Sequence, residues 1–550
     1  MTMLQGCTPF PAAVAERYRA AGVWRGQTIG EALDEASARS ASRLALVVAD
    51  RRFTYAELAA GVERLADHLV ALGFRPGERV VMQLPNVAEF VLLYFALLKI
   101  GVIPIMALPA HRATEIDYFV SHADAAAYAI PRQFRSFDYV ALAREMREKH
   151  PGLSRILVAD RDIPEDEGFL SIPRLLEREA PKRPAYRPDP FDVALFLLSG
   201  GTTGLPKLIP RTHADYLYNA SLTAEVCEFN ATTVLLIAIP VSHNFALACP
   251  GVHGVFQVGG TLVLATTPDP DEVLSLIARE RVTCMPAVPA LHIAVMDKQE
   301  ASPRDISSLR QILAGGSKFL PESAARAMRV LDCKVQQVIG MAEGFISFTR
   351  LDDPEATVLE TVGRKISPLD EFRLVDEEGK DVPQGGIGEL WVRGPYTIRG
   401  YYRADEHNAK AFTPDGFYKT GDMLRLDRAG NLVVEGRLKD MINRAGEKIS
   451  AEEVENLVAD QPKIQTAALV AMPDPQVGER SCLFVTCQPG ATLTLAEVIA
   501  HLEKKRVARF KFPERLEVLE RFPLTAVGKI SKKDLRELIK RKLEEEGKLR

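Results

Sequence analysis

A glycine- and hydroxyl-rich segment that directly follows an apolar run constrains this 550-residue chain more than any other feature. Residues 193–198 read Val-Ala-Leu-Phe-Leu-Leu, and residues 199–207 read Ser-Gly-Gly-Thr-Thr-Gly-Leu-Pro-Lys. The apolar run predicts a buried strand. The glycines let backbone N–H groups approach an anion closely, while the hydroxyls and Lys207 offer donors and positive charge. A strand that leads into such a loop indicates a site for the phosphates of a nucleotide.

This loop is not a P-loop of the Walker A type. That motif requires a lysine followed by Ser or Thr directly after its last glycine, whereas here Leu205 and Pro206 intervene before Lys207. Because a P-loop serves attack at the γ-phosphate, the chemistry of this loop has to be inferred from the rest of the chain.

Length and charge narrow the class of protein. A chain of 550 residues is too long for one hydrophobic core and predicts at least two domains. A formal net charge of −4 gives no electrostatic footprint for nucleic acid. The seven cysteines are odd in number and scattered without a C-x-x-C pair, which favours a reducing compartment and disfavours structural zinc.

We expect neither a signal peptide nor a membrane span. The N-terminus lacks a basic stretch followed by an uninterrupted apolar core. The most apolar run, residues 91–108, is interrupted by Lys99, Gly101 and Pro104, and therefore predicts a buried helix followed by a strand. We expect a cytoplasmic protein with no membrane partner.

The order of elements predicts an α/β fold with covered parallel sheets. Strands are expected at 79–84, 102–107, 234–238 and 261–265, with helices at 87–100 and 270–279. Short strands at 372–375 and 388–393 indicate a β-rich subdomain. The predicted architecture is a large N-terminal domain of stacked α/β sheets over residues 1–438, with the β-rich subdomain at 363–438, and a small mobile C-terminal α+β domain over residues 439–550.

The C-terminal domain is expected to contain helices at 452–458 and 496–504 and a strand at 466–471. A linker is expected at 437–440, before a polar loop over residues 443–448. The charged tail after Ser531 has helical spacing and favours a solvated helix over a binding patch.

Five ordered motifs resemble the adenylate-forming superfamily of acyl-CoA synthetases, luciferases and the adenylation domains of nonribosomal peptide synthetases. The first is the loop that begins at Ser199. The others are Gly340-Met341-Ala342-Glu343-Gly344, Tyr418-Lys419-Thr420-Gly421-Asp422, Gly436-Arg437-Leu438-Lys439-Asp440 and Pro523-Leu524-Thr525-Ala526-Val527-Gly528-Lys529. The resemblance covers essentially the whole chain. It implies that a carboxylate attacks the α-phosphorus of ATP and that a thiol then displaces AMP.

The resemblance also assigns the nucleotide site. Glu343 is the expected Mg²⁺ ligand, with Thr203 beside it, since a hard cation prefers oxygen donors shared with substrate phosphates. Asp422 is expected to bind the ribose hydroxyls, and Gly316 and Val338 to wall the adenine slot. The full set of expected ATP-binding residues is Ser199, Gly200, Gly201, Thr202, Thr203, Gly204, Lys207, Gly316, Val338, Glu343, Asp422, Arg437 and Lys448.

Two lysines are expected to act in the change from the first half-reaction to the second. The resemblance brings Lys529 onto the carboxylate and the α-phosphate during adenylation, where an ammonium group offsets charge on both reacting groups. Lys439 is the expected hinge about which the C-terminal domain turns, which would bring the loop around Gly446 to the thiol tunnel.

The expected acid-binding segment is Pro240-Val241-Ser242-His243-Asn244-Phe245-Ala246-Leu247-Ala248-Cys249-Pro250. Its His-Asn pair resembles the stand-alone aryl acid ligases of siderophore synthesis, which activate salicylate or 2,3-dihydroxybenzoate. The same pattern recurs in Gln336-Gln337-Val338, Tyr401-Tyr402 and residues 406–412. Asn244 is expected to recognise a neutral ortho-hydroxyl, because an amide can both donate and accept. His243 either shapes the mouth of the pocket or is an ordinary core histidine.

Two positions favour salicylate. Dihydroxybenzoate enzymes of this group usually have Ser where this chain has Cys249, and Val where it has Ile346. A thiol is a poor partner for a 3-hydroxyl, and isoleucine narrows the floor of the slot. Phe245 and Ala342 are also expected to line the ring. Both changes could instead be neutral packing variants.

The sequence thus predicts an aryl acid–AMP ligase that uses ATP and Mg²⁺ to make salicyl-adenylate. It would pass the acyl group to the phosphopantetheine thiol of a separate aryl carrier protein. The alternatives are a 2,3-dihydroxybenzoate–AMP ligase, an aryl-CoA ligase that uses free coenzyme A, and a nucleotide-binding sensor that has lost catalysis.

Overall fold

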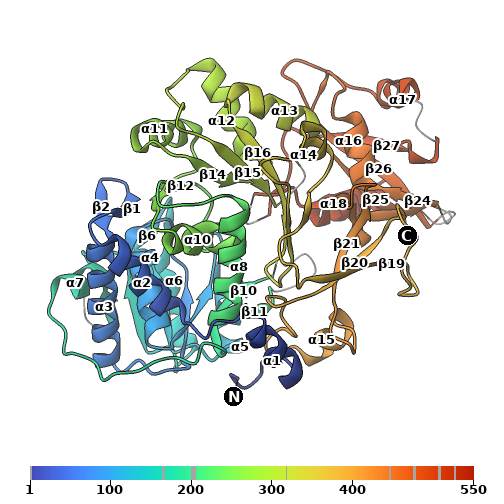
Figure 1. The fold of residues 1–550 in the computed structure, drawn as a ribbon. Coiled ribbons are helices and arrows are strands. Elements are labelled where there is room, and N and C mark those ends of the chain that lie inside the picture. Colours follow the sequence, from blue (N-terminus) through green and yellow to red (C-terminus); the bar gives the residue numbers. More distant parts are fainter. Residues whose placement is uncertain are drawn as a thin grey trace. The chain divides into compact units, whose positions relative to one another are not determined.

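Figure 1 shows the computed structural model of the chain. The structure describes residues 3–163, 168–199, 206–316, 319–444, 447–474, 478–505, 509–525 and 528–549. It divides into two compact units. The first comprises Met1–Glu371 and Val392–Tyr418, and the second comprises Phe372–Trp391 and Lys419–Arg550.

The first unit contains two large sheets with mainly parallel strands. One has nine strands in the order β18 (Arg364–Lys365), β17 (Ile346–Phe348), β16 (Lys334–Gly340), β15 (Gln311–Gly315), β14 (Cys284–Ala287), β12 (Val234–Ile237), β13 (Thr261–Leu264), β1 (Leu44–Val48) and β2 (Arg51–Thr54). The other has seven strands in the order β11 (Leu208–Thr212), β10 (Val193–Leu198), β4 (Ile103–Met106), β3 (Arg79–Met82), β5 (Ala127–Ile130), β8 (Arg155–Val158) and β9 (Phe169–Ser171). A separate hairpin pairs β6 (Gln133–Phe134) with β7 (Phe137–Asp138). The predicted α/β class is confirmed.

Helices connect and cover these strands. Those of the first unit are α1 (Ala12–Ala20), α2 (Ile29–Ser40), α3 (Tyr55–Ala71), α4 (Ala88–Lys99), α5 (Ala113–His122), α6 (Tyr139–Lys149), α7 (Ile172–Glu177), α8 (His213–Val226), α9 (Asn244–Ala248), α10 (Gly251–Gln257), α11 (Pro270–Glu280), α12 (Pro289–Ala301), α13 (Pro321–Val330), α14 (Glu355–Glu360) and α15 (Asp405–Ala411). Strand-to-helix switches follow cap chemistry: Thr212 ends β11 and closes a capping box with Asp215 at the start of α8.

The longest apolar run of the chain folds as predicted, into a buried helix and a strand. Every residue of α4 is buried, and β4 follows it in the seven-stranded sheet. Lys99 ends α4 with its ammonium group 2.5 Å from carboxylate oxygens of both Asp34 and Glu63, so the buried charge is paired. Among the described residues, no helix combines the length and the apolarity that a bilayer crossing needs.

Within its described residues, the second unit contains two sheets and three longer helices. A four-stranded sheet has the order β19 (Glu371–Val375), β20 (Gly388–Arg393), β21 (Tyr418–Leu426) and β22 (Leu432–Arg437). A second sheet contains β23 (Met441–Arg444), β24 (Glu447–Ser450), β25 (Ile464–Asp474), β26 (Gly478–Cys487) and β27 (Arg515–Val518). The helices are α16 (Ala451–Val458), α17 (Leu495–Lys504) and α18 (Lys532–Glu545), with short 3-10 turns at Leu438–Asp440 and Arg509–Lys511.

Alternating residues of the central strands build a core on each face of this second sheet. Leu469 and Leu483 pack with α16 and α17, whereas Val470 and Phe484 pack with α18. The predicted tail helix is therefore present but is not solvated all round, because Leu535, Ile539 and Leu543 on one face are buried.

Two further predictions differ from the structure. The polar residues 443–448 were expected to form a loop, but β23 and β24 pair Asn443 with Lys448 and Arg444 with Glu447 in a hairpin. The β-rich segment was grouped with the N-terminal domain, whereas residues 372–391 and 419–437 cluster with the C-terminal unit. The Ser450 hydroxyl, at the end of β24, donates to the carbonyl of Glu435 in β22 and so links the two sheets of this unit. Whether the chain pivots at residue 439 stays a prediction.

Candidate active site

The glycine-rich loop joins two antiparallel strands, so no helix follows it directly. β10 and β11 pair from Val193–Thr212 to Leu198–Leu208. The ends of the loop are pinned twice: the Ser199 amide donates to the Lys207 carbonyl across 3.0 Å, and the Lys207 amide donates to Ser199 Oγ across 2.9 Å. The loop's interior residues that were assigned to phosphates, namely Gly200, Gly201, Thr202, Thr203 and Gly204, lie outside the described residues.

Glu343 lies in the tight connection between β16 and β17, and its side chain is buried at 7% exposure. Gly344 turns this connection with a φ of +123°, and a Cβ there would lie 2.4 Å from Thr397 Cα, so only glycine fits. The phenol of Tyr401 donates to Glu343 Oε1 across 2.8 Å. The carboxylate is thus held at the end of a parallel sheet by residues of the same unit.

The segment that was expected to bind the acid forms the short helix α9 and the cis Cys249–Pro250 bond after it. His243 caps α9, because its Nδ1 accepts from the Phe245 amide across 3.2 Å. Asn244 starts the helix, and its Nδ2 donates to Cys249 Sγ across 3.5 Å. Burial raises the pKa of the Cys249 thiol to about 12, so it stays neutral. Of the residues expected to bind the acid, Asn244 and Cys249 are therefore in direct contact.

Apolar side chains pack closely against two glycines near the segment that was expected to bind the acid. A Cβ on Gly315 would lie 3.1 Å from Phe245 Cζ and 3.4 Å from Val338 Cβ. A Cβ on Gly340 would lie 3.3 Å from Ile346 Cγ1. The strands β15 and β16 pair Gly315 with Val338, and Gly316 directly follows β15. The predicted lining residues Gly316, Val338 and Ile346 therefore lie at one edge of the nine-stranded sheet. Ala342 follows on the same hairpin, where its carbonyl accepts from Arg211 Nη1 across 3.0 Å.

Sequence reasoning missed two buried groups, Arg211 and Tyr216, that contact these residues. Arg211 is fully buried in β11 and pairs with Asp215 across 2.8 Å, and its guanidinium lies 4.8 Å from the centre of the Tyr216 ring. Tyr216 in turn donates to Asn244 Oδ1 across 2.8 Å. The available signal was one arginine in a fully buried strand, since a buried charge needs partners within the protein.

In the second unit, the register of β21 and β22 places Asp422 directly opposite Arg437. Asp422 is buried at 8% exposure. Lys529 follows Gly528 in a turn that is closed by two bonds, the Thr525 amide to the Lys529 carbonyl across 2.7 Å and the Lys529 amide to Thr525 Oγ1 across 3.2 Å. Lys439 lies in the short 3-10 turn between β22 and β23 and Lys448 in β24, while Gly446 lies outside the described residues.

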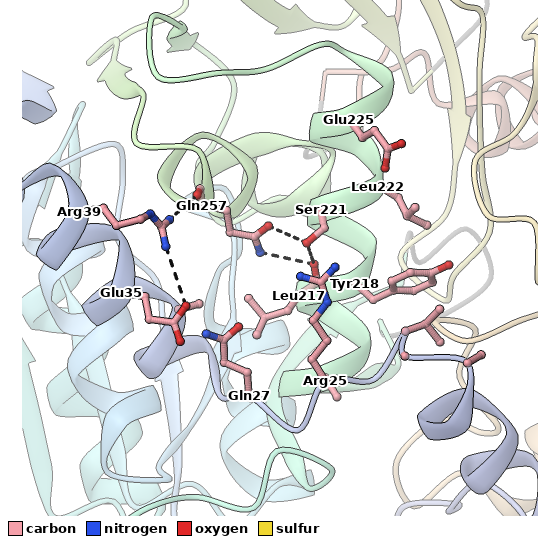
Figure 2. Close-up of a pocket in the computed structure, with 15 residues that line it drawn as sticks. Arg25, Gln27, Glu35, Arg39, Leu217, Tyr218, Ser221, Leu222, Glu225 and Gln257 are labelled. Carbon is pink, nitrogen blue, oxygen red and sulfur yellow. Dashed lines mark hydrogen bonds and ion pairs between the residues drawn. The ribbon is translucent and has the colours of Figure 1, made fainter.

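A separate cavity of about 420 Å³ borders the other face of α8 (Figure 2). Leu217, Tyr218 and Ser221 line it. Tyr216 and Asn219, which donate to Asn244 and to the Ala248 carbonyl, lie on a different face of the helix because of its 3.6-residue period. Ser221 Oγ donates to Gln257 within the cavity. This cavity is not part of the candidate active site.

Comparison with known proteins agrees with this geometry. Residues 33–402 match the model of the AMP-binding enzyme family, and residues 453–529 match that of the AMP-binding enzyme C-terminal domain. The chain therefore belongs to the AMP-binding enzymes, and the resemblance to adenylate-forming ligases is confirmed. It is an enzyme of that adenylate-forming class.

Three relatives match almost from end to end. The chain is 48% identical to a 2,3-dihydroxybenzoate-AMP ligase of Bacillus subtilis, covering 98% of this chain and 99% of the relative. It is also 48% identical to a salicylyl-CoA synthase / salicylate adenylyltransferase of a Streptomyces species, covering 98% of each chain. A salicyl-AMP ligase / salicyl-S-ArCP synthetase of Mycobacterium tuberculosis is 43% identical over 96% of this chain and 94% of its own length.

Proposed function

We propose that this enzyme is a salicylate–AMP ligase. It would join salicylate to the α-phosphorus of ATP with loss of pyrophosphate, and then transfer the salicyl group to the phosphopantetheine thiol of an aryl carrier protein in siderophore biosynthesis. One observation carries the proposal: the amide of Asn244 contacts the neutral thiol of Cys249. Phe245 and Ile346 would supply the apolar walls beside these two groups. Such a slot suits one aromatic ring with one ortho-hydroxyl.

The state of Cys249 favours salicylate over 2,3-dihydroxybenzoate. Its sulfur already accepts from Asn244 Nδ2 at 3.5 Å and lies 3.9 Å from Asn219 Nδ2. A thiol so engaged offers little to a 3-hydroxyl, and an unpaired buried hydroxyl costs about 1–3 kcal/mol. Overall similarity does not distinguish the two acids, because a relative named for each of them is 48% identical to this chain. The residues of the proposed acid pocket therefore decide between them.

The nucleotide would lie between the pinned loop that begins at Ser199 and the Glu343 hairpin, with Gly316 and Val338 beside its base. Asp422 and Arg437 would hold the ribose, and Lys448 would add a further contact. The buried oxygens of Glu343 suit Mg²⁺, a hard cation, with Thr203 as a second ligand. Bound Mg²⁺ would neutralise the phosphates as pyrophosphate leaves.

The remaining steps belong to the chain's own groups. Lys529 would offset the charge of the attacking carboxylate and the α-phosphate during adenylation. Lys439 would be the pivot that withdraws it, and the loop around Gly446 would then border the thiol. His243, which caps α9, would hold the mouth of the acid pocket in place. We place the enzyme in the cytoplasm, where ATP and carrier proteins are found.

The test is acid-dependent exchange of labelled pyrophosphate into ATP. Salicylate should support faster exchange than 2,3-dihydroxybenzoate, and benzoate should support the slowest. A preference for 2,3-dihydroxybenzoate would refute the choice of acid, and no exchange with any aryl acid would favour a nucleotide-binding sensor. Thioester formation with a phosphopantetheinylated aryl carrier protein, compared with free coenzyme A, decides between the two acceptors.

A further inference from the structure

The orientation of the Asn244 amide has a structural cause in helix α8. Tyr216 is completely buried, and its hydroxyl donates to Asn244 Oδ1 across 2.8 Å. Burial raises the pKa of this phenol well above its ordinary value, so the hydroxyl keeps its proton. This bond uses one of the two lone pairs of Asn244 Oδ1 and fixes the orientation of the amide before any acid binds.

Tyr216 itself cannot turn away easily. Its ring lies 4.8 Å from the guanidinium carbon of Arg211 and 5.2 Å from the ring of His253. Asp215, the neighbouring residue, closes the capping box of α8 through Thr212. These contacts and the dense packing of the interior oppose rotation of the ring away from Asn244.

Arg211 fixes this arrangement to the nucleotide side of the site. One nitrogen pairs with Asp215 across 2.8 Å, and another donates to the carbonyl of Ala342, the residue before Glu343. The acid-recognising amide and the Glu343 hairpin thus share one buried support.

With its oxygen held toward Tyr216, Asn244 directs its Nδ2 away from that tyrosine. Its Nδ2 carries two N–H bonds, and its protein acceptor is the sulfur of Cys249 at 3.5 Å, a weak acceptor. The group presented to the ortho position of an aryl acid is consequently an N–H.

From this we infer that Tyr216 is a positioning residue for specificity: it holds Asn244 as a donor, so that the enzyme accepts a 2-hydroxybenzoate and rejects a 2-aminobenzoate. This inference rests on the proposed adenylation of an aryl acid. A 2-hydroxyl donates its proton to the acid's own carboxylate and turns an oxygen lone pair outward. A 2-amino group shares its lone pair with the ring and turns a second N–H outward, so two donors meet.

The experiment measures kcat/KM for pyrophosphate exchange with salicylate, 2-aminobenzoate and benzoate. Wild-type enzyme should prefer salicylate over 2-aminobenzoate by roughly 5- to 150-fold, the equivalent of one unpaired buried donor. Tyr216→Phe keeps the ring but frees Asn244 Oδ1, so this preference should fall at least fivefold, while the rate with benzoate, which lacks an ortho group, should change little.

The matched control is Tyr128→Phe. Tyr128 is also fully buried and also donates its hydroxyl to an amide oxygen, that of Gln83, but in the seven-stranded sheet. Its loss should leave the salicylate to 2-aminobenzoate ratio unchanged. Equal loss with all three acids in Tyr216→Phe, or an unchanged ratio, overturns the inference.

A second variant keeps the inference testable should Tyr216→Phe fold poorly. Asn244→Asp leaves Tyr216 a carboxylate partner and replaces the donor by an acceptor, so 2-aminobenzoate should become the better of the two substituted acids. Persisting preference for salicylate in Asn244→Asp refutes the donor role. Wild-type enzyme that exchanges with none of the three acids refutes the proposed function itself, a result distinct from either of these.

Discussion

The hydroxyl of Tyr401 donates to Glu343 Oε1 across 2.8 Å, and the hydroxyl of Tyr418 lies 3.0 Å from the Tyr401 oxygen. Tyr401 and Glu343 are both buried, with exposures of 3% and 7%. Burial and the nearby charge of Glu343 raise the pKa of the Tyr401 phenol, so it remains a donor. A buried carboxylate is stable only with such donors, and the proposed metal ligand therefore depends on a tyrosine that is 58 residues away along the chain.

Replacing Tyr401 by Phe should lower the free energy of unfolding by about 1–3 kcal/mol, because a charge-assisted hydrogen bond in the interior is lost. The Mg²⁺ concentration needed for half-maximal exchange should also rise. Tyr402→Phe is the matched control: Tyr402 is equally buried, yet its hydroxyl has no hydrogen-bond partner within the described ranges. Urea unfolding and a Mg²⁺ titration measure both effects. Similar losses in the two variants would contradict this role for Tyr401.

Cys249→Ser should improve 2,3-dihydroxybenzoate relative to salicylate by roughly 5- to 150-fold, since a hydroxyl pairs with the 3-hydroxyl where a thiol does not. Adding Ile346→Val should strengthen the shift by widening the floor beside Gly340. Relative kcat/KM for exchange with the two acids is the measurement.

Cys284→Ser is the control for replacing a buried sulfur atom by oxygen. Cys284 is buried in β14 of the nine-stranded sheet, with its Sγ 3.7 Å from Gln311 Nε2. It should leave the ratio between the acids unchanged. A ratio that moves equally in both serine variants would show a general loss of packing and not a change in the acid pocket.

Lys529→Ala should slow adenylation by about 10²–10³-fold, because one preorganised charge on the reacting phosphate is lost. Transfer from preformed salicyl-adenylate to the carrier should continue at close to the wild-type rate. Lys533→Ala, on the exposed side of α18, should alter neither half-reaction. The two half-reactions are measured separately, and equal losses in both would argue against a role of Lys529 confined to adenylation.

The features that sequence reasoning placed well are those that depend on neighbouring residues. The apolar run before Ser199 is β10, and the Gly-Met-Ala-Glu-Gly motif is the hairpin between β16 and β17. Asn244 and Cys249 were predicted to bind the acid, but their contact with each other was not predicted, although only four residues separate them.

What the sequence did not reveal depends on contacts across long separations. Tyr216 meets Asn244 over 28 positions, and Arg211 meets Ala342 over 131. Tyr216 and Asn244 lie in the helices α8 and α9, whereas Arg211 lies in a strand of one sheet and Ala342 in a hairpin of the other. Each pair exists only because separate elements pack together, and no local pattern specifies which of them will meet. The hairpin at 441–450 was missed because its polar residues favour a turn locally, while pairing between β23 and β26 supports strands.

A buried acid behind the pocket should make stability depend on pH. Asp370 is 1% exposed, and burial raises the pKa of its carboxyl to about 7, although hydrogen bonding by Tyr396 and the charge of Lys365 oppose the shift. Its Oδ1 has no hydrogen-bond partner in the part of the chain that the structure describes. The Tyr396 hydroxyl that donates to Asp370 also lies 3.3 Å from the Ile346 amide, at the floor of the proposed slot.

Since the folded pKa exceeds the unfolded value of about 3.9, the native state holds this proton between about pH 4 and pH 7, and the unfolded state does not. Asp370 therefore lowers the free energy of unfolding as the pH rises from about 4 to about 7. Above pH 7 it causes no further decrease. Asp370→Asn cannot ionise, so its stability relative to wild type should improve by roughly 2–3 kcal/mol between pH 5 and pH 8. Urea unfolding at both pH values measures the difference, with the exposed Asp332→Asn as control. A relative stability that does not change with pH would mean that Asp370 is already ionised in the folded enzyme at pH 5.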